Sequence, residues 1–274
     1  MSELVLTLRR PVPRRLDASP IAPDKLAGRS VGEIKNMVLY FEDGERTVIG
    51  AVFDVAGTAS NDLRIVGALS RVDRLGTGMT SGILTIEGDA GHRVGDAMSG
   101  GRIEVAGDAG NFIGREMRGG EIIVRGDVGD GAGGASPGSK RGMTGGEIVV
   151  FGSAGARTGA CMRRGVIAVG GDVGPGALRA AIAGTLVAFG NISPPAGRWS
   201  KRASLIALAD VAIPPSYEYS CTYQPGFVRV LLTHLRRRYG LSAPPGLHEH
   251  EWYERYDGDM AELGRGEILR RLKI

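Results

Sequence analysis

A 19-residue periodicity is the feature of this sequence that most restricts its possible folds. Met79, Met98 and Met117 recur at this constant interval, and the same interval separates Met143 from Met162. The longer interval from Met117 to Met143 is the same unit with seven residues inserted around 131–140. Glycine recurs with this spacing, and aspartate follows four members of the series Gly88, Gly107, Gly126, Gly152, Gly171 and Gly190. Self-similarity at a fixed period indicates a repeat architecture.

Each unit also carries one pair of apolar residues separated by a single position. The pairs are Leu84/Ile86, Ile103/Val105, Ile122/Val124, Ile148/Val150, Ile167/Val169 and Leu186/Ala188. This alternation places both members on one face of a short strand. Glycine supplies 45 of the 274 residues, and an interior glycine costs a helix about 1 kcal/mol, so the rest of each unit is not helical.

These patterns predict an all-β chain, a right-handed parallel β-helix of about seven 19-residue rungs with glycine at the corners. The left-handed hexapeptide type would place an aliphatic residue every six positions, and the sequence lacks that pattern. We expect residues 1–60 to form an N-terminal cap, 61–193 the repeats, and 194–274 a partly helical C-terminal extension. Pro194-Pro195 is expected to end the repeats, and the apolar spacing in 227–239, followed by Gly240, predicts a helix that packs along the stack.

Several classes of function are disfavoured by composition. No apolar run approaches the roughly 20 residues of a membrane helix, the N-terminal segment does not resemble a signal peptide, and the expected location is cytoplasmic. A net charge of +4 does not indicate a nucleic-acid partner. Cys161 and Cys221 are too far apart for a CxxC zinc site. The run His248-Glu-His-Glu251 has metal-like spacing but lacks a third ligand, so no metal site and no catalytic residue is predicted.

The positions that alternate with the core pairs should face outward. In the later units they form an apolar strip, which consists of Ile123, Val149, Phe151, Val187 and Phe189. An exposed apolar strip marks either a partner-docking surface or a bed for another segment of the same chain. The sequence leaves both alternatives open.

A second outward column, two residues before each methionine position, contains Arg115, Arg141 and Arg179. Neighbouring strands lie about 5 Å apart, so Arg115 and Arg141 are expected one step apart on a single face. Opposed like charges are destabilising, and solvent, a nearby aspartate or a bound anion must compensate them. A solvated basic face and an anion site therefore remain as alternatives.

The unit G-D-x-G-x-x-x-G-x-x-M-x-x-G-x-I-x-V resembles the C subunit of formylmethanofuran dehydrogenase and of the bacterial formyltransferase/hydrolase complex. It is also similar to the C-terminal β-helix domain of glutamate synthase. The resemblance covers Leu63–Asn191 and resumes at Gly258–Ile268. It implies a non-catalytic structural subunit in tetrahydromethanopterin- and methanofuran-linked one-carbon metabolism, from formaldehyde to formate. Amidohydrolase-like, molybdoenzyme-like and formyltransferase subunits would be its partners and would carry the catalysis.

The resemblance also implies contact with a carrier of the methanofuran type, which has a tail of glutamates, while no cofactor is expected on this chain alone. The candidate residues for that tail are Arg115, Arg118, Lys140, Arg141, Arg163 and Arg179. Two alternatives stand beside this interpretation. One is an autonomous acyltransferase-like β-helix enzyme with His92 as its base, and the other is a structural domain like that of glutamate synthase.

Overall fold

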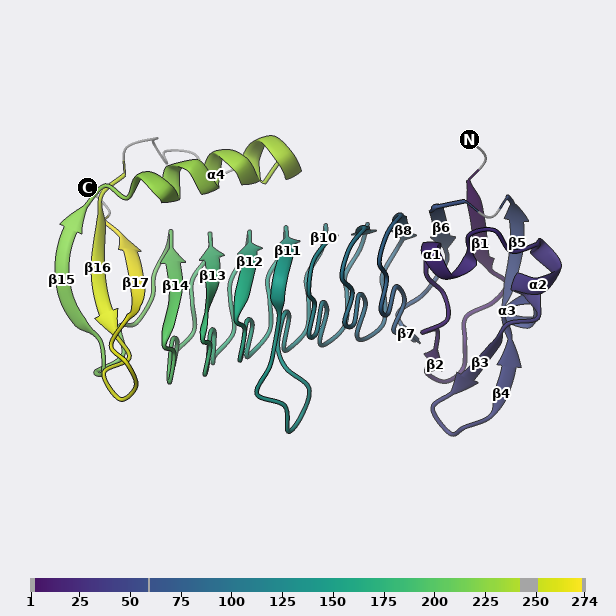
Figure 1. Cartoon of the computed structure of the whole chain (residues 1–274), viewed down its shortest axis with the longest axis horizontal. Helices are drawn as coiled ribbons and strands as arrows, with labels where there is room; N and C mark the ends of the chain where they lie inside the picture. The colour runs from purple at the N-terminus through teal and green to yellow at the C-terminus, as the bar shows by residue number, and fades with distance from the viewer. Residues whose placement is uncertain (1–2, 59, 242–250, 273–274) are drawn as a thin grey trace.

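A computed structural model describes residues 3–58, 60–241 and 251–272 of a mostly β chain (Figure 1). The strands of the larger sheet are β1 (Leu4–Leu8), β5 (Phe53–Gly57), β6 (Asp62–Val66), β8 (Ile83–Glu87), β9 (Arg102–Val105), β10 (Glu121–Val124), β11 (Thr144–Val150), β12 (Arg164–Val169), β13 (Ala183–Ala188), β14 (Arg202–Ala207), β15 (Glu218–Tyr223), β16 (Tyr253–Gly258) and β17 (Gly266–Arg271). They form a mixed 13-stranded sheet in the order β15-β16-β17-β14-β13-β12-β11-β10-β9-β8-β6-β1-β5.

The remaining elements lie mainly at the N-terminal end. A four-stranded sheet, in the order β4-β3-β2-β7, comprises β2 (Leu16–Asp17), β3 (Val38–Phe41), β4 (Arg46–Val48) and β7 (Val72–Asp73). The helices are α1 (Pro23–Leu26), α2 (Val31–Lys35), α3 (Ile49–Val52) and α4 (Gly226–Tyr239). The short helices α1–α3 were not expected from the sequence, although α2 begins with a capping box formed by Ser30 and Glu33.

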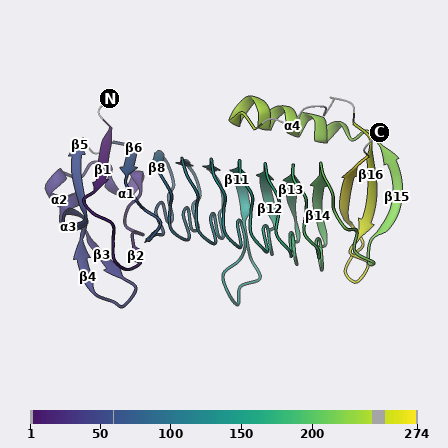
Figure 2. The same ribbon diagram turned by 180° about the vertical axis from the view of Figure 1, so that it is seen from behind.

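Consecutive 19-residue units stack in parallel and in register. The first members of five predicted core pairs are hydrogen-bonded neighbours in successive strands and are fully buried, which confirms their inward orientation: Ile103, Ile122, Ile148, Ile167 and Leu186. A second ladder of single-residue bridges joins the opposite side of the units, at Leu69, Ala90, Ala109, Val128, Ala154, Val173, Ile192 and Val211. The arrangement is consistent with a β-helix-like fold, and both views show the row of parallel strands (Figures 1 and 2).

The expected end of the repeats at residue 193 is wrong. β14 pairs in parallel with β13, and Leu205 continues the inward ladder beyond Leu186. Pro194-Pro195 lies at an exposed corner of the stack, where the missing proline amides interrupt no strand pairing and the Pro195 carbonyl still accepts the Gly176 amide at 2.8 Å. β17 then pairs with β14, so 258–268 does rejoin the stack.

The N-terminal segment extends the sheet at its other end. Strand β1 pairs in parallel with β6, which places Leu4 and Leu6 against Leu63 and Ile65 in the same inner ladder. Strand β5 then pairs antiparallel with β1. The first repeat therefore has no open strand edge, because residues preceding it in the chain occupy that edge.

Methionine and glycine are coupled between neighbouring units. The methionines of the repeat are fully buried, and each ε-methyl group fills the space above a glycine of the next unit. A β-carbon added to Gly120 would lie 2.8 Å from Met98 Cε, and one added to Gly184 would lie 2.4 Å from Met162 Cε. One unit later Ala181 replaces the methionine, and Ala203 replaces the glycine. The recurring M-x-x-G spacing thus reflects packing of each methionine against the following unit.

Helix α4 lies along the large sheet and covers the apolar strip (Figures 1 and 2). Its buried residues Val228, Leu235 and Tyr239, together with Leu241 after the helix, pack into one cluster with four residues of the strip, Ile123, Val149, Val187 and Phe189. Phe151, the fifth, is half-buried beside them. The chain's own C-terminal segment therefore occupies the strip. The prediction that the strip is a partner-docking surface is wrong, because its side chains are covered by another segment of the same chain.

The methionine–glycine coupling predicts that Gly120→Ala destabilises the protein by about 1–3 kcal/mol, the usual cost of overpacking a core. The added carbon meets Met98 Cε and lies 2.7 Å from the Gly101 carbonyl oxygen, and the φ of +89° disfavours any side chain. Denaturant unfolding measures the change. Gly226→Ala is the control, since no atom lies within 4 Å of its added carbon. Equal stability of the two variants would contradict the coupling.

The burial of the strip predicts that Leu235→Asp releases α4 without dissolving the stack. Leu235 is fully buried, so its loss costs at least about 2 kcal/mol, and a carboxylate there would be desolvated. We expect faster tryptic cleavage at Arg236–Arg238 with unchanged β-sheet circular dichroism. Val230→Asp on the same helix is the matched control, because Val230 is 66% exposed. Cleavage at the wild-type rate in Leu235→Asp would show that α4 is held elsewhere.

Candidate functional site

Most of the predicted cationic residues lie on one edge of the stack, in the turns that precede the strands of the large sheet. Five of them are exposed and form no ion pair with another described residue: Arg118, Lys140, Arg141, Arg163 and Arg179. We call these five residues the basic edge. Their charges are available to an external anion.

Arg115 differs from this set. Its Nε donates to Asp96 Oδ1 at 3.0 Å, and its Nη2 donates to Asp96 Oδ2. The side chains are only 13% and 6% exposed. Asp96 lies one full period before Arg115, so an aspartate of the preceding unit compensates the charge. The sequence left open whether solvent, an aspartate or a bound anion compensates the charge of Arg115, and the structure shows that an aspartate does.

The seven-residue insertion alters the predicted arginine column. The amide of Ala97 donates to the Arg115 carbonyl, and the amide of Glu116 donates to the Gly134 carbonyl, so Gly134 follows Arg115 in this ladder. The chain rejoins the stack at Gly142, whose amide donates to the Cys161 carbonyl at 2.9 Å. Arg141 is therefore not the next member of the column after Arg115, because it belongs to the inserted segment that ends where the chain rejoins the stack at Gly142. The insertion projects from the stack as a loop before β11 (Figure 1).

The insertion is fastened to the stack by Glu116. Its carboxylate accepts hydrogen bonds from the amide of Ser136 at 3.1 Å and from the Ser136 hydroxyl. The bond from the hydroxyl is the main reason that the pKa of Glu116 lies below its ordinary value. This anchor holds the loop that carries Lys140 and Arg141.

The opposite turns form an acidic ladder that explains the Gly-Asp pattern. Asp89 Oδ1 accepts the amide of Asp108 at 2.9 Å, and Asp108 Oδ1 accepts the amide of Asp127 at 2.8 Å. Asp172 binds the amide of Asn191 in the same way. Each side chain thereby satisfies a backbone donor of the next unit. The carboxylates are structural, and the two edges of the stack carry opposite charge.

His92, the candidate base of an acyltransferase-like enzyme, belongs to a similar ladder. Its Nδ1 accepts the amide of Asn111 at 2.9 Å, and its own amide donates to Asp73. Burial is the main cause that lowers the pKa of His92, with Arg15 adding to it. One ring nitrogen is therefore committed to holding the backbone. This role does not support general base catalysis.

The described ranges 3–58, 60–241 and 251–272 contain no group of three or more His, Cys, Asp or Glu side chains placed to hold a metal ion. His248 and His250 lie outside these residues, and Glu251 forms an ion pair with Arg271 at 3.2 Å. Within the same ranges, no helix has the length and apolar character needed to span a membrane.

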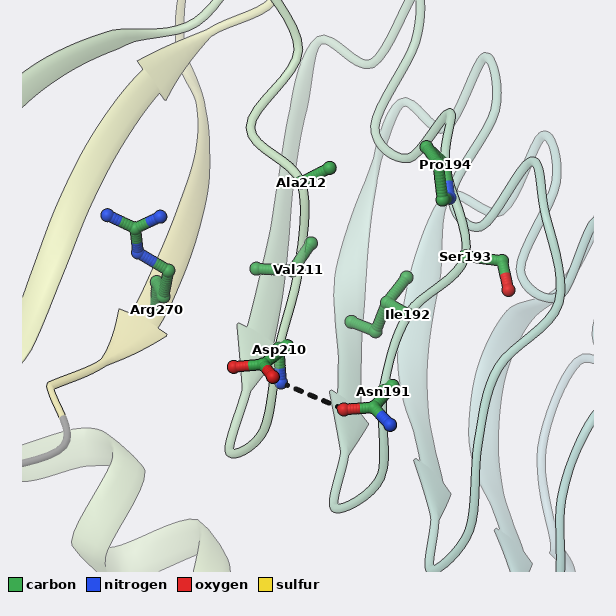
Figure 3. A pocket seen from close by; sticks show the side chains of 8 residues that line it. All are labelled: Asn191, Ile192, Ser193, Pro194, Asp210, Val211, Ala212 and Arg270. Carbon is green, nitrogen blue, oxygen red and sulfur yellow. Dashed lines mark hydrogen bonds between the residues drawn. The ribbon is translucent and has the colours of Figure 1, made fainter.

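A shallow cavity of about 500 Å³ opens at the C-terminal end of the stack (Figure 3). Its lining residues are Asn191, Ile192, Ser193, Pro194, Asp210, Val211, Ala212 and Arg270. Two of the polar side chains there are already engaged, since Asn191 Oδ1 accepts the Asp210 amide at 3.2 Å and Arg270 donates to Glu254 and Tyr256. The ladder of described single-residue bridges ends at Val211. The cavity lies at this end, where no further described unit stacks on the ladder.

Sequence reasoning missed the polar border of α4. Glu147 accepts the Tyr239 hydroxyl and lies 3.0 Å from His234 Nε2, and Glu121 accepts Arg238 at 2.9 Å. Burial and the bond to Glu147 raise the pKa of Tyr239, so it remains a donor. The glutamates of two successive units thus hold this end of the helix. Glu121 and Glu147 occupy equivalent positions in successive units, and this recurrence was the sequence signal that could have revealed the contact.

Comparison with known proteins gives a consistent answer, although no family model matches the sequence. The chain is 39% identical over 94 residues to the C subunit of the tungsten-containing formylmethanofuran dehydrogenase 2 of Methanothermobacter marburgensis, covering 32% of this chain and 34% of that protein. It is 36% identical over 88 residues to the C subunit of the formyltransferase/hydrolase complex Fhc of Methylorubrum extorquens, covering 32% and 33%. The matched segments thus span about a third of the length of these curated relatives.

A solved structure matches along nearly the whole chain. It is a chain in the crystal structure of the formyltransferase/hydrolase complex (FhcABCD) from Methylorubrum extorquens in complex with methylofuran, with a TM-score of 0.88 and 33% identity. The match covers 98% of this chain and 100% of that chain. The repeat, the register of the stack and this full-length similarity place the chain in the family of C subunits of formylmethanofuran dehydrogenases and formyltransferase/hydrolase complexes.

Proposed function

We propose that the chain is the structural C subunit of a formyltransferase/hydrolase complex. The complex would serve methanofuran- and tetrahydromethanopterin-linked one-carbon metabolism, from formaldehyde to formate. The full-length similarity to a chain of the FhcABCD complex carries this proposal. Amidohydrolase-like, molybdoenzyme-like and formyltransferase subunits would be its partners and would supply the chemistry.

The side chains support a scaffold role over the acyltransferase-like alternative. His92 is committed to a backbone amide, and the exposed aspartates of the acidic ladder each bind the next unit. A stack of this kind offers long, rigid edges of opposite charge on which separate subunits can be positioned. The full-length match to a chain of the hydrolase complex supports this role over the glutamate-synthase-like alternative.

We infer in addition that the stack is a right-handed parallel β-helix of 19-residue rungs. The in-register pairing at this interval and the second ladder of bridges support closed coils. Connections between parallel strands of one sheet are right-handed in nearly all proteins. The free thiols of Cys161 and Cys221 fit a reducing compartment, and we propose a cytoplasmic location.

The scaffold proposal predicts that the isolated chain shows neither formyl transfer nor formate release. Co-expression with the other three subunits from the same genome should yield one particle that contains all four chains, and omission of this chain should separate the others. Native mass spectrometry and size-exclusion chromatography measure both results. Turnover by the isolated chain, or assembly of the other three subunits that proceeds equally well without it, would contradict the proposal.

The basic edge supports a second, more specific proposal. The matched complex was crystallised with methylofuran, and the family resemblance implies a carrier with a glutamate tail. Arg118, Lys140, Arg141, Arg163 and Arg179 present unpaired charges that such a tail could contact. Each exposed pair contributes only about 0.2–1 kcal/mol, so retention of the tail requires several contacts together. Arg115 is omitted because Asp96 holds its guanidinium.

This proposal predicts that Arg141→Glu/Arg163→Glu raises the KM for a long-tailed carrier. Two lost pairs correspond to about a 2- to 30-fold change, which should shrink at high salt. Steady-state turnover of the assembled complex with long-tailed and tail-less carriers measures the effect. Arg10→Glu/Arg46→Glu is the control, since both residues are exposed and lie in the N-terminal segment. Equal effects on the two carriers would mean that the arginines do not contact the tail.

A further inference from the structure

The last turn of the stack ends differently from the preceding ones. In earlier units the amide of the turn residue donates to a carbonyl of the next unit, as Ala180 does to Arg198 at 2.8 Å. Trp199 occupies the equivalent place in the last unit, where no further described unit follows. Its amide donates instead to Asp259 Oδ2 at 2.7 Å. Asp259 begins the loop between β16 and β17, at the C-terminal end of the molecule (Figure 1).

Two arginines flank the Trp199 side chain. The guanidinium carbons of Arg179 and Arg198 lie 4.5 and 5.0 Å from the centroid of the indole ring. Both distances are within cation–π range. Neither arginine forms an ion pair with another residue of the described ranges. Asp259 interacts electrostatically with Arg198, and this interaction helps to lower the pKa of Asp259. The two guanidinium groups beside the ring therefore outnumber this one carboxylate.

The same end of the stack exposes further large apolar side chains. Trp199 is 37% exposed, and Met260 and Leu263 of the closing loop are 46% and 56% exposed. The loop is fixed against the last turn by the Asp259 bond and by an ion pair between Lys201 and Glu262 at 3.4 Å. Trp199 also has a φ of +61°, a region that bulky residues rarely adopt. The backbone that carries the exposed ring is thus fixed against the closing loop.

This combination has the composition of an interaction hot spot. Interfaces are enriched in tryptophan, methionine and arginine, and binding energy concentrates on such anchors. Arginine forms paired, charge-assisted hydrogen bonds with carboxylates. The chain covers its apolar strip with α4, but no described segment covers Trp199 in the same way, since the ring remains over a third exposed.

We propose that Trp199, Arg179, Arg198, Met260 and Leu263 form a docking site for one partner subunit of the same complex. The partner supplies an apolar pocket for the indole and at least one carboxylate that pairs with the two guanidinium groups. The excess of positive charge around Trp199 decides the nature of this occupant, because an acidic surface complements it and a second basic copy of this turn does not. The inference rests on the proposed function as the structural subunit of such a complex.

The test measures the affinity of the full chain for each of the other three subunits, purified separately, by biolayer interferometry. We expect Trp199→Ala to weaken Kd at least tenfold, and Arg179→Gln/Arg198→Gln to weaken it several-fold and to reduce its dependence on salt. Tyr40→Ala is the control, since Tyr40 is 52% exposed at the other end of the molecule. Thermal unfolding establishes that each variant is folded, and Trp199→Phe serves as a milder change if Trp199→Ala is not.

The outcomes separate the two proposals. Unchanged affinity in the folded variants, with normal binding by the wild type, overturns the docking site and leaves the scaffold role intact. Failure of the wild-type chain to bind any of the three subunits overturns both. If the arginine variant binds normally but loses turnover only with a long-tailed carrier, the cluster contacts the tail and the docking proposal is wrong.

Discussion

Hydrogen bonding between successive 19-residue units is the constraint on which the rest of the structure depends. Once Ile122 pairs with Ile148, the other residues of the two strands also lie beside their equivalents, one strand spacing away. The residue type at each position must therefore fit the equivalent part of the neighbouring unit. The methionine methyl requires a glycine above it, and the aspartate carboxylate receives the next amide. Ala181 and Ala203 show that the methionine and the glycine are replaced together.

Such regularity confines functional differences to the places where units differ from one another. The seven-residue insertion brings Lys140 and Arg141 out of the stack, and the later units replace outward polar residues with the apolar strip that α4 covers. Glu121 and Glu147 then hold the end of that helix through Arg238 and Tyr239. The remaining surfaces are a basic edge and an acidic edge, which suit a protein that positions others.

The register could be predicted from the sequence because two periodicities determine it. A period of 2 within the strand and of 19 between strands is sufficient to orient Ile148 and its neighbours. The end of the repeats could not be read in the same way, since a proline pair stops a strand but is tolerated at a corner. The occupant of the strip was also undetermined, because a partner and α4 would bury the same side chains. The pairing of Asp96 with Arg115 was readable, since one period separates them, whereas the insertion displaced Arg141 from the inferred column.

A stack of identical units has no intrinsic end, so each end requires a separate device. At the N-terminal side, β1 and β5 continue the sheet, so that its edge strand is β5 and not a strand of the repeat. At the C-terminal side, β17 adds one more strand and Asp259 supplies a carboxylate where a carbonyl of the next unit would lie. Burial alone raises the pKa of Asp259, but the amides of Trp199 and Ala261 outweigh it, and the net pKa is lowered. The final turn is therefore closed by a charged side chain. No following unit of the described chain stacks on its outer face, and this is where Trp199 and two arginines can gather.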